Sequence, residues 1–346
     1  MLQLRNTSPF AASLFGIPDQ RGVDTLIVVV KASFCFGDPP SIAPEQVPVV
    51  LADEYWGAPE SSSLRYPSEV HFGKPGADVL VLGEARAPRD QPVTELEVSV
   101  RVGDRSKRAR VHGDRYWTEG VRGLQPSRAQ PFVRMPLIYE RAFGGQQLDR
   151  HGRTLADPRN PVGVGFLGER HPSELLGHPV PNLDDPDHPL ERLGQAPPPV
   201  GFGALAPSWA PRLDYAGTYD ERWRKLRAPL LPEDFDPRYF HAGAEGLRFD
   251  EPLRGGEPVL LDGLDPDRRW QFTVPRCELE IVARIAGEAR PLRPVLETVL
   301  LEPEARRFCL SWRASSRVAG QLLRVERVSI GLASVEGVAE RGEDPA

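Results

Sequence analysis

Hydrophobic and polar residues alternate with a period of two in several parts of the chain. Residues 96–102 (LEVSVRV) alternate strictly, which places their four aliphatic side chains on one face of a strand and the polar ones on the other. Gly103 and Asp104 then turn the chain into residues 107–112, which predicts a β-hairpin. Residues 23–36 (VDTLIVVVKASFCF) begin as an unbroken apolar run and then alternate, which is typical of a strand buried first on both faces and then on one.

The same patterns predict strands on both sides of a long central region. Residues 302–305 (EPEA) separate two of these strands and predict a hairpin turn. We therefore expect a mainly β fold, with antiparallel sheets in one or two sandwich-like lobes and little helix. The further predicted strands are residues 79–85, 133–139, 270–274, 279–285, 296–301, 307–313 and 322–330.

Regular alternation of apolar and polar residues is nearly absent between residues 144 and 258. Prolines interrupt this region throughout, yet it contains large aromatic residues, which a disordered tether would lack. We interpret it as a long, ordered, irregular Pro/Gly-rich insertion packed as a layer on the β core. The predicted organisation is an N-terminal β lobe (1–143), this layer (144–258), C-terminal β strands (259–332) and a frayed tail (333–346). The C-terminal strands form either a second lobe or one continuous domain with the first lobe.

One stretch of the layer, residues 217–240 (GTYDERWRKLRAPLLPEDFDPRYF), mixes aromatic and charged residues without a regular period. Its three prolines exclude one long helix, because each lacks an amide donor and restricts the residue before it. Residues 220–227 are predicted to form at most two helical turns, with Asp220 as the N-cap. Because an aromatic side chain in so irregular a segment needs contacts, we expect Trp223 to be mostly buried.

Composition and charge exclude several classes of protein. The chain has 346 residues and a formal net charge of −6 at pH 7, so no nucleic-acid partner is expected, since such proteins usually carry a basic excess. Cys35, Cys277 and Cys309 are widely separated in apolar runs, which indicates free thiols in a reducing compartment. The first residues lack the basic and apolar regions of a signal peptide, and no segment is long enough to span a membrane. We therefore expect a cytoplasmic protein without a membrane partner.

Several distinctive strings follow one another along nearly the whole chain. They are YERAFGG (139–145), NPVGVGF (160–166), the stretch 217–240, LRGGEPVLLDGL (253–264), ETVLLEP (297–303) and SWRA (311–314). In these strings the chain resembles a bacterial family of unknown function that is encoded beside the spike genes of type VI secretion systems. The resemblance implies an adaptor or chaperone that binds a secreted effector, or its PAAR-containing N-terminal part, and helps to load it onto the VgrG spike. It attaches no catalytic role to the strings.

The strings and the stretch 217–240 supply the candidate partner-binding residues. Arg141 has two interpretations. In the first, which we favour, its guanidinium pairs with Asp234 or Asp236 and holds the layer against the sheet. In the second, it is exposed together with Phe143, Tyr219 and Trp223, and these residues anchor a partner. The full candidate set is Tyr139, Glu140, Arg141, Phe143, Gly144, Gly145, Asn160, Pro161, Tyr219, Asp220, Arg222, Trp223, Arg224, Asp234 and Phe235.

Motifs for catalysis or cofactors are weak. Residues 163–168 (GVGFLG) match a dinucleotide fingerprint, but neither a strand before nor a helix after them is predicted, so the glycines are expected to let the loop pass close to another segment. The loop 171–188 contains three histidines and three aspartates without the spacing of a known metal site. We therefore predict no catalytic residues, no metal and no cofactor. The alternative function is a hydrolase that uses carboxylates or a metal in this loop.

Overall fold

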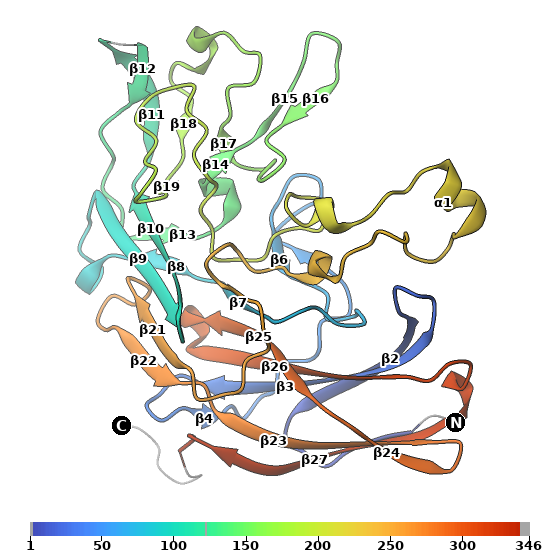
Figure 1. The fold of residues 1–346 in the computed structure, drawn as a ribbon. Coiled ribbons are helices and arrows are strands. Elements are labelled where there is room, and N and C mark those ends of the chain that lie inside the picture. The colour runs from blue at the N-terminus through green and yellow to red at the C-terminus, as the bar shows by residue number, and fades with distance from the viewer. Residues whose placement is uncertain (1–2, 122, 340–346) are drawn as a thin grey trace.

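The computed structural model describes residues 3–121 and 123–339. Strands account for 43% of the chain and helices for 9%, so the predicted mainly β fold with mostly antiparallel sheets is confirmed. Figure 1 shows sheets in the lower part of the molecule, a region of short strands and turns above them, and a segment around α1 that projects to one side.

A seven-stranded sheet forms the centre of the fold. Its strand order is β2-β3-β26-β25-β7-β20, with β4 added beside β3. Neighbours are antiparallel except β25 and β7, which are parallel. The strands are β2 (Ala11–Pro18), β3 (Asp24–Cys35), β4 (Ser41–Ile42), β7 (Ala77–Val81), β20 (Arg248–Phe249), β25 (Val295–Glu302) and β26 (Arg307–Arg317).

The predicted strand at 23–36 is present as β3, but its second half is not buried on one face only. Lys31 and Ser33 are as buried as the apolar residues around them. Their polar groups have buried partners, Glu69 for Lys31 and Cys309 for Ser33, so alternation of polarity here does not mark a solvent face.

Two further sheets flank the central one. The predicted hairpin is confirmed as β9 and β10, with Val98 opposite Ala109 and Arg101 opposite Ser106. One flanking sheet has the order β1-β27-β23-β24 and the other β19-β10-β9-β21-β22. The strands are β1 (Gln3–Asn6), β27 (Val325–Glu336), β23 (Arg276–Ile285), β24 (Glu288–Leu292), β19 (Leu183–Asp184), β10 (Arg105–His112), β9 (Glu95–Val102), β21 (Pro258–Asp262) and β22 (Trp270–Thr273).

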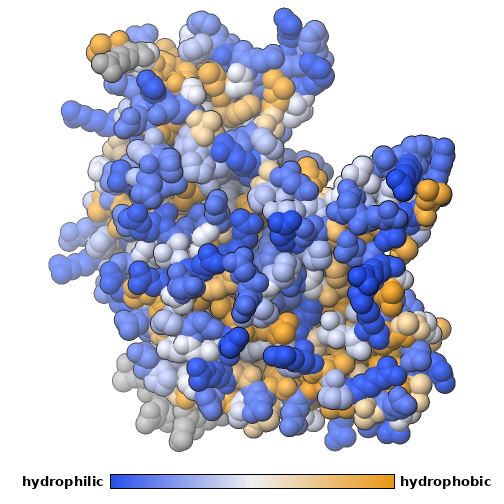
Figure 2. Space-filling view, viewed as in Figure 1, coloured by the Kyte–Doolittle hydropathy of each residue, from blue (hydrophilic) through white to orange (hydrophobic). Residues whose placement is uncertain are grey.

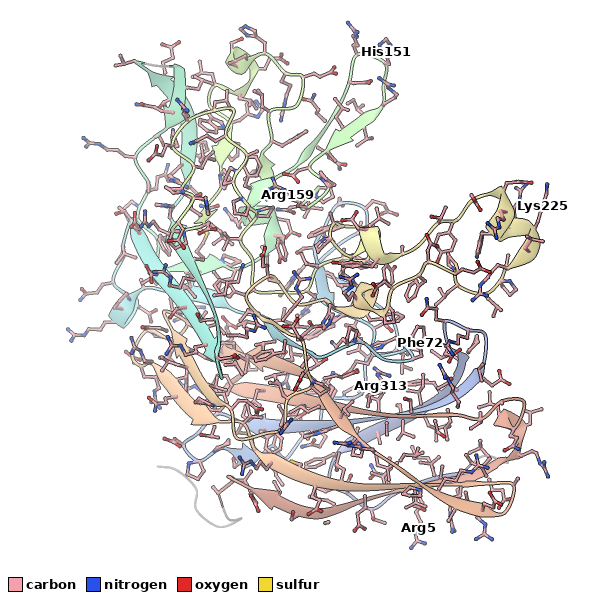
Figure 3. The ribbon with its side chains drawn as sticks, viewed as in Figure 1. Arg5, Phe72, His151, Arg159, Lys225 and Arg313 are labelled. Carbon is pink, nitrogen blue, oxygen red and sulfur yellow. The ribbon has the colours of Figure 1, made fainter. Side chains whose placement is uncertain are left out.

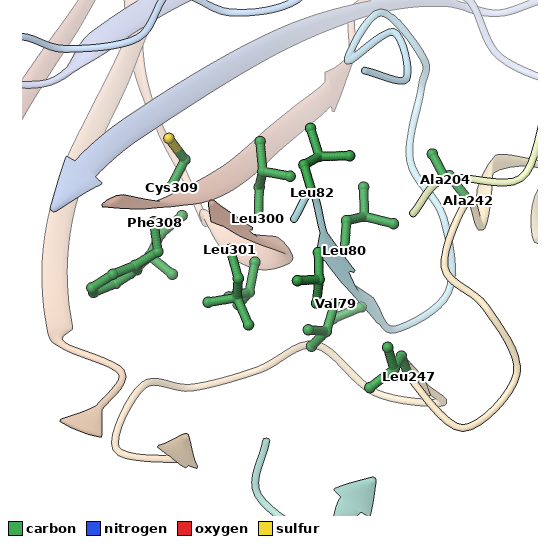
Figure 4. Packing of buried hydrophobic residues seen from close by; sticks show 14 of the residues in the cluster. Val79, Leu80, Leu82, Ala204, Ala242, Leu247, Leu300, Leu301, Phe308 and Cys309 are labelled. Carbon is green, nitrogen blue, oxygen red and sulfur yellow. The ribbon is translucent and has the colours of Figure 1, made fainter. Parts of the chain in front are cut away.

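One hydrophobic core joins the three sheets. Phe308 of the central sheet packs on Phe34 at 5.2 Å between ring centroids and on Phe272 of a flanking sheet at 4.9 Å. Figure 4 shows that residues of the layer, including Ala242 and Leu247, lie close to Val79 and its neighbours in this core. Strands from the beginning and the end of the chain therefore share one core with the layer.

Several predicted boundaries differ from the structure. The predicted strand 79–85 is two strands in different sheets, because Gly83 lies between β7 and β8 (Glu84–Arg86), which pairs with β13 (Arg134–Pro136). The predicted strand 322–330 begins as a 3-10 turn (Leu322–Arg324) before β27. β27 continues through Glu336, paired opposite Arg276, so residues 333–336 are a strand and not a frayed tail. Residues 340–346 of the predicted tail lie outside the described residues.

The layer and the upper region consist of short strands and single turns. A second, small core of five residues (Trp117, Phe143, Leu175, Val180, Leu190) supports the upper region. Its strands are β5 (Glu54–Tyr55), β6 (Leu64–Tyr66), β11 (Arg115–Gly120), β12 (Gly123–Pro126), β14 (Phe143–Gly144), β15 (Gln146–Leu148), β16 (Thr154–Ala156), β17 (Val164–Gly165) and β18 (Pro179–Val180). Among the described residues there is one α-helix, α1 (Glu221–Leu226), and 3-10 turns at Pro88–Asp90, Tyr139–Arg141, Pro172–Leu175, Leu213–Tyr215, Pro237–Phe240 and Pro303–Ala305.

Candidate functional site

The strings at 139–145 and 160–166 lie against each other. β14 and β17 pair in parallel, with Phe143 opposite Val164 and Gly144 opposite Gly165. Asn160 is fully buried, and its side-chain amide donates to the carbonyls of Tyr139 at 2.8 Å and Phe143 at 2.9 Å. A Cβ on Gly144, whose φ is +146°, would lie 2.1 Å from the Asn160 carbonyl oxygen, so only glycine permits this approach. Gly145 and Pro161 belong to the same tightly packed junction.

The other residues of the first string make internal contacts. Tyr139 is buried and meets Trp209 edge to face at 5.4 Å. Both carboxylate oxygens of Glu140 accept hydrogen bonds from Ser63, one from its N–H and one from its hydroxyl, each at 2.7 Å. Phe143 lies in the second core and is 3% exposed, so its predicted role as an exposed anchor is wrong.

Arg141 does not pair with Asp234 or Asp236, so this prediction is wrong. Its guanidinium donates to Asp114 at 3.2 Å and to the side-chain oxygen of Asn182 at 3.1 Å, and the side chain remains partly exposed. The two predicted partners are occupied within their own segment. Asp234 accepts from the N–H and hydroxyl of Thr218, and Asp236 accepts from the backbone and side chain of Arg238.

Residues 217–240, which we name the arm, form a loop closed at its base. Thr218 and Asp234 join its two sides through two hydrogen bonds, at 2.9 and 2.7 Å. Phe235 is buried and packs against Phe72 and Phe240. Figure 1 shows the arm projecting from the layer beside the central sheet, with α1 at its outer end, and Figure 3 labels Lys225 there.

The tip of the arm is ordered by its own residues. The predicted N-cap is confirmed, because the Asp220 carboxylate accepts from the Trp223 N–H at 2.7 Å. The Trp223 indole donates to the Leu230 carbonyl at 2.8 Å and packs on Tyr219 at 4.7 Å. Trp223 is largely covered, in agreement with the expectation that it is mostly buried. Its neighbours come from the arm itself and not from the core.

Apolar and cationic side chains are exposed together on the arm. Tyr219 is 53% and Leu226 78% exposed, and Arg222, Trp223 and Leu226 line a shallow depression of about 400 Å³. Arg224 pairs with Glu221, whereas Arg222 makes no ion pair or hydrogen bond among the described residues. In Figure 2 hydrophobic residues stand among hydrophilic ones at the outer end of the arm.

A buried ionic cluster underlies the base of the arm, and sequence reasoning missed it. Arg313 is 1% exposed and makes a bidentate pair with Glu297, with N–O distances from 2.6 to 3.0 Å. Its remaining donors meet the backbone carbonyls of His71 at 2.7 Å and Glu69 at 2.8 Å. All three guanidinium nitrogens therefore donate hydrogen bonds inside the protein.

Two further ion pairs extend this cluster. Lys31 donates to Glu69 at 3.0 Å, and the Ser311 hydroxyl donates to the other Glu69 oxygen. Asp78, fully buried, accepts from Lys74 at 2.6 Å and from the Ala242 N–H at 2.9 Å. We define the ionic cluster as Lys31, Glu69, His71, Lys74, Asp78, His241, Glu297, Ser311 and Arg313.

The ionic cluster fastens the layer to the central sheet. His241 lies 2.8 Å from Asp78, and the Phe240 ring stacks on His71 at 4.7 Å, so the last residue of the arm and the residue after it are held over the sheet. The void beside these residues has a volume of about 30 Å³, close to the share of one water molecule. The cluster therefore positions the arm.

The packing around His71 determines its protonation state. Burial, reinforced by the Arg313 charge, holds the pKa of His71 well below its ordinary value of 6.5. The Gly73 N–H lies 3.2 Å from its Nδ1, and an Arg313 N–H group lies 3.0 Å from its Nε2. The 3.5 Å contact between His71 and Glu297 thus joins a neutral imidazole to a carboxylate and is not an ion pair.

A signal for the ionic cluster is present in the sequence. Single charged residues interrupt otherwise apolar strands, as Lys31 does in VVVKASF and Asp78 in ADVLV. A charge at the centre of a buried strand must have a buried partner. The strings ETVLLEP and SWRA, which contain Glu297 and Arg313, served only as marks of family resemblance.

The loop 171–188 does not assemble a metal site. Among residues 3–121 and 123–339, no three His, Cys, Asp or Glu side chains are placed to hold a metal ion. His171 caps the 3-10 turn Pro172–Leu175, Asp184 binds Arg115 at 2.9 Å, and His188 faces Asp185 at 3.3 Å. The glycines of 163–168 lie against neighbouring chain segments, as expected, with the Gly163 Cβ position 2.6 Å from the Ala142 carbonyl oxygen.

The three cysteines are free, in agreement with the expectation from their spacing. Within the described part of the chain, no helix has the length and hydropathy needed to cross a membrane.

Comparison with known proteins yields one result. No curated protein and no solved structure matches this chain. The model of one protein family, described as an uncharacterized protein conserved in bacteria, matches residues 21–313. The match covers most of the chain, including the ionic cluster and the whole arm, and the chain therefore belongs to the DUF2169 family.

Proposed function

We propose that this chain is a non-enzymatic adaptor or chaperone of a type VI secretion system. It binds an effector, or the PAAR-containing N-terminal part of one, and helps to load it onto the VgrG spike. The observation that carries the proposal is the projecting arm, which exposes Tyr219, Arg222 and Leu226 together around Trp223. The resemblance of the strings to secretion-associated proteins suggests the class of partner.

The chemistry of the arm suits protein recognition. Tyr, Trp and Arg are the residue types that dominate the binding energy of protein interfaces. The Arg222 guanidinium has no ion pair among the described residues, so a partner carboxylate could bind it without competing with an internal one. Only Trp223 of this group is substantially covered, which leaves apolar surface for a partner to bury.

The arm is also organised before docking. The Asp220 cap, the Trp223–Leu230 hydrogen bond and the Thr218–Asp234 bonds hold its backbone in one shape. A surface that is already ordered loses less conformational freedom when a partner binds. Stable binding still requires a broad contact, of roughly 1,000 Å² or more, so the arm acts together with neighbouring parts of the layer.

The test is binding of the purified chain to the effector encoded beside it. Reversal of charge in Arg222→Glu should weaken the complex about tenfold or more, because a partner carboxylate would then face a carboxylate. Arg254→Glu is the matched control, since Arg254 is an exposed arginine of the same layer away from the arm. Calorimetry gives the affinity, and circular dichroism checks that both variants are folded.

Hydrogen exchange locates the interface independently. New protection on complex formation should fall within residues 144–258 and include the arm. Equal affinities for Arg222→Glu and the native chain, together with protection confined to strands outside 144–258, would show that the arm is not the binding surface.

A further inference from the structure

A hollow of about 840 Å³ lies between the β9–β10 hairpin and the layer. Its walls include Lys107 and Arg108 of β10, the buried Tyr139, Pro198 and Pro199 of the layer, and Arg248. Arg159, labelled in Figure 3, stands on its wall as well. The volume lies in the range of sites that bind ligands or peptide segments.

Of the four cationic side chains that line this hollow, Arg248 and Lys107 make no ion pair among the described residues. Arg248 is half-buried and makes no ion pair or side-chain hydrogen bond among the described residues. The Lys107 ammonium is bound only by the backbone carbonyl of Glu245, at 3.0 Å. Arg159, by contrast, is held by Asp157, and Arg108 lies within reach of Glu97 and Asp187. Arg248 is therefore the cation most open to a ligand, whereas the Lys107 ammonium also feels the charges of Asp185 and Glu245 on the wall of the hollow.

The Tyr139 hydroxyl and Arg248 lie close enough to influence each other. Burial raises the pKa of Tyr139, and the Arg248 charge opposes that rise. Burial lowers the pKa of Lys107, and the same arginine adds to the lowering. No described residue is hydrogen-bonded to the Tyr139 hydroxyl, so this hydroxyl and the Arg248 guanidinium are open to a ligand, while the carboxylates of Asp185, Asp187 and Glu245 also line the hollow.

The backbone of β10 adds a further donor and acceptor. His112 donates its N–H to Asn182, on the side away from β9, and alternate residues of a strand direct their N–H and C=O groups to the same side. Arg108 therefore directs its backbone groups into the hollow, and β19 pairs with β10 only at Arg110 and Val111. The loop at Gly246 approaches the Ser106 carbonyl, which leaves Arg108 as the open position of this edge.

We propose that the hollow binds an acidic, extended segment of the partner protein. A carboxylate of that segment binds Arg248 and Lys107 and accepts a hydrogen bond from the Tyr139 hydroxyl. The backbone of the segment forms hydrogen bonds with the backbone of Arg108. Apolar side chains of the segment contact Pro198 and Pro199. This inference rests on the proposed adaptor function and adds the chemistry of the bound segment. An extended peptide suits the hollow better than a compact anion, because the donors come from well-separated segments.

The experiment uses the full chain and its co-encoded effector. Arg248→Gln removes the charge at similar size, and Tyr139→Phe removes only the hydroxyl. Each should weaken the complex about tenfold, and Arg248→Gln should also reduce the dependence of affinity on salt concentration. Arg254→Gln, an arginine outside the hollow, should bind as the native chain does. Melting temperatures identify any variant that is misfolded.

A photo-cross-linking residue at the exposed Glu245, on the rim of the hollow, identifies what enters it. Mass spectrometry should find an effector segment that contains Asp or Glu. Native affinity in both Arg248→Gln and Tyr139→Phe, or capture of a segment without acidic residues, overturns this inference. If Arg222→Glu still weakens the complex in that case, the adaptor function stands. Failure of the native chain to form any complex with the effector overturns both proposals.

Discussion

At the scale of single residues, Arg313 shows how a full charge is buried. Removing a guanidinium from water is costly unless every donor finds an acceptor. Here the Glu297 carboxylate accepts from Nε and Nη2, and the carbonyls of His71 and Glu69 accept from Nη1 and Nη2. The arrangement depends on all four groups at once, so loss of one leaves a buried charge or a buried polar group unsatisfied.

Arg313→Met should lower the free energy of unfolding by about 3–5 kcal/mol, because it leaves the Glu297 carboxylate buried without its partner. The double variant Arg313→Met with Glu297→Leu should recover part of this loss, since no uncompensated charge then remains. Urea denaturation measures both. Arg307→Met is the control, because the Arg307–Glu302 pair lies on the same two strands but at a more exposed position. Equal losses in the Arg313 and Arg307 variants would contradict this account of burial.

At the scale of elements, α1 cannot be stable through its own hydrogen bonds. A helix of six residues is far shorter than the length at which isolated helices form in water. It persists because Asp220 caps its first turn and Trp223 ties its last turn to Leu230. Arg227 also bonds the backbone of Gln20 in the β2–β3 turn, which holds the arm against the central sheet.

Asp220→Ala should loosen the tip of the arm and leave the rest of the fold intact. Loss of an N-cap costs about 1 kcal/mol, and the cost falls on a short element that few other contacts support. Hydrogen exchange followed by mass spectrometry should show faster exchange at Trp223 and Arg224, with unchanged exchange in β3. Asp214→Ala, at an exposed 3-10 turn where the aspartate forms no cap, should leave the arm unchanged. Slower exchange or a global loss of protection in Asp220→Ala would contradict the assignment.

At the scale of the whole molecule, the layer is part of the same folding unit as the sheets. Its residues Ala204, Ala242 and Leu247 belong to the main core, and His241 binds Asp78 in the central sheet. The protonation state of the ionic cluster should therefore affect the stability of the whole chain. Burial and the Arg313 charge keep His71 neutral in the folded state, whereas an unfolded His71 titrates near 6.5.

Stability should fall as the pH is lowered through about 6.5, because the unfolded state then binds a proton at His71 that the folded state excludes. A second decline should follow below about 3.8. Although burial opposes it, the charges of Lys74 and His241 hold the pKa of Asp78 below that ordinary value, so its contribution is present at higher pH and is lost on acidification. Urea midpoints measured from pH 8 to pH 3 give the profile.

His71→Asn tests the origin of the first decline. Asparagine can still accept from the Gly73 N–H but does not titrate in this range, so the slope between pH 6.5 and pH 5 should become shallower. A variant that keeps the native slope would assign the decline to other groups.

Local patterns were sufficient for the features that neighbouring residues determine. The β9–β10 hairpin follows from alternation over 95–112 with a two-residue turn, and the Asp220 cap follows from a carboxylate three residues before the Trp223 N–H. The mainly β class follows in the same way, because the strand period is visible in the apolar positions themselves. These features need no information from distant parts of the chain.

Only the tertiary structure decided which distant groups meet. Arg141 binds Asp114 and Asn182 instead of Asp234, because the arm satisfies its own aspartates and projects away from the first string. Trp223 is covered by partners that come from the arm alone and not from the core. Arg313 meets the carbonyl of Glu69, 244 positions earlier in the chain, because β26 brings it beneath the loop that contains Glu69. Sequence alone therefore determined the mainly β class, the hairpin and the cap. Strand boundaries and charge pairing depended on how the layer packs on the sheets, since these properties involve residues that only the completed fold brings together.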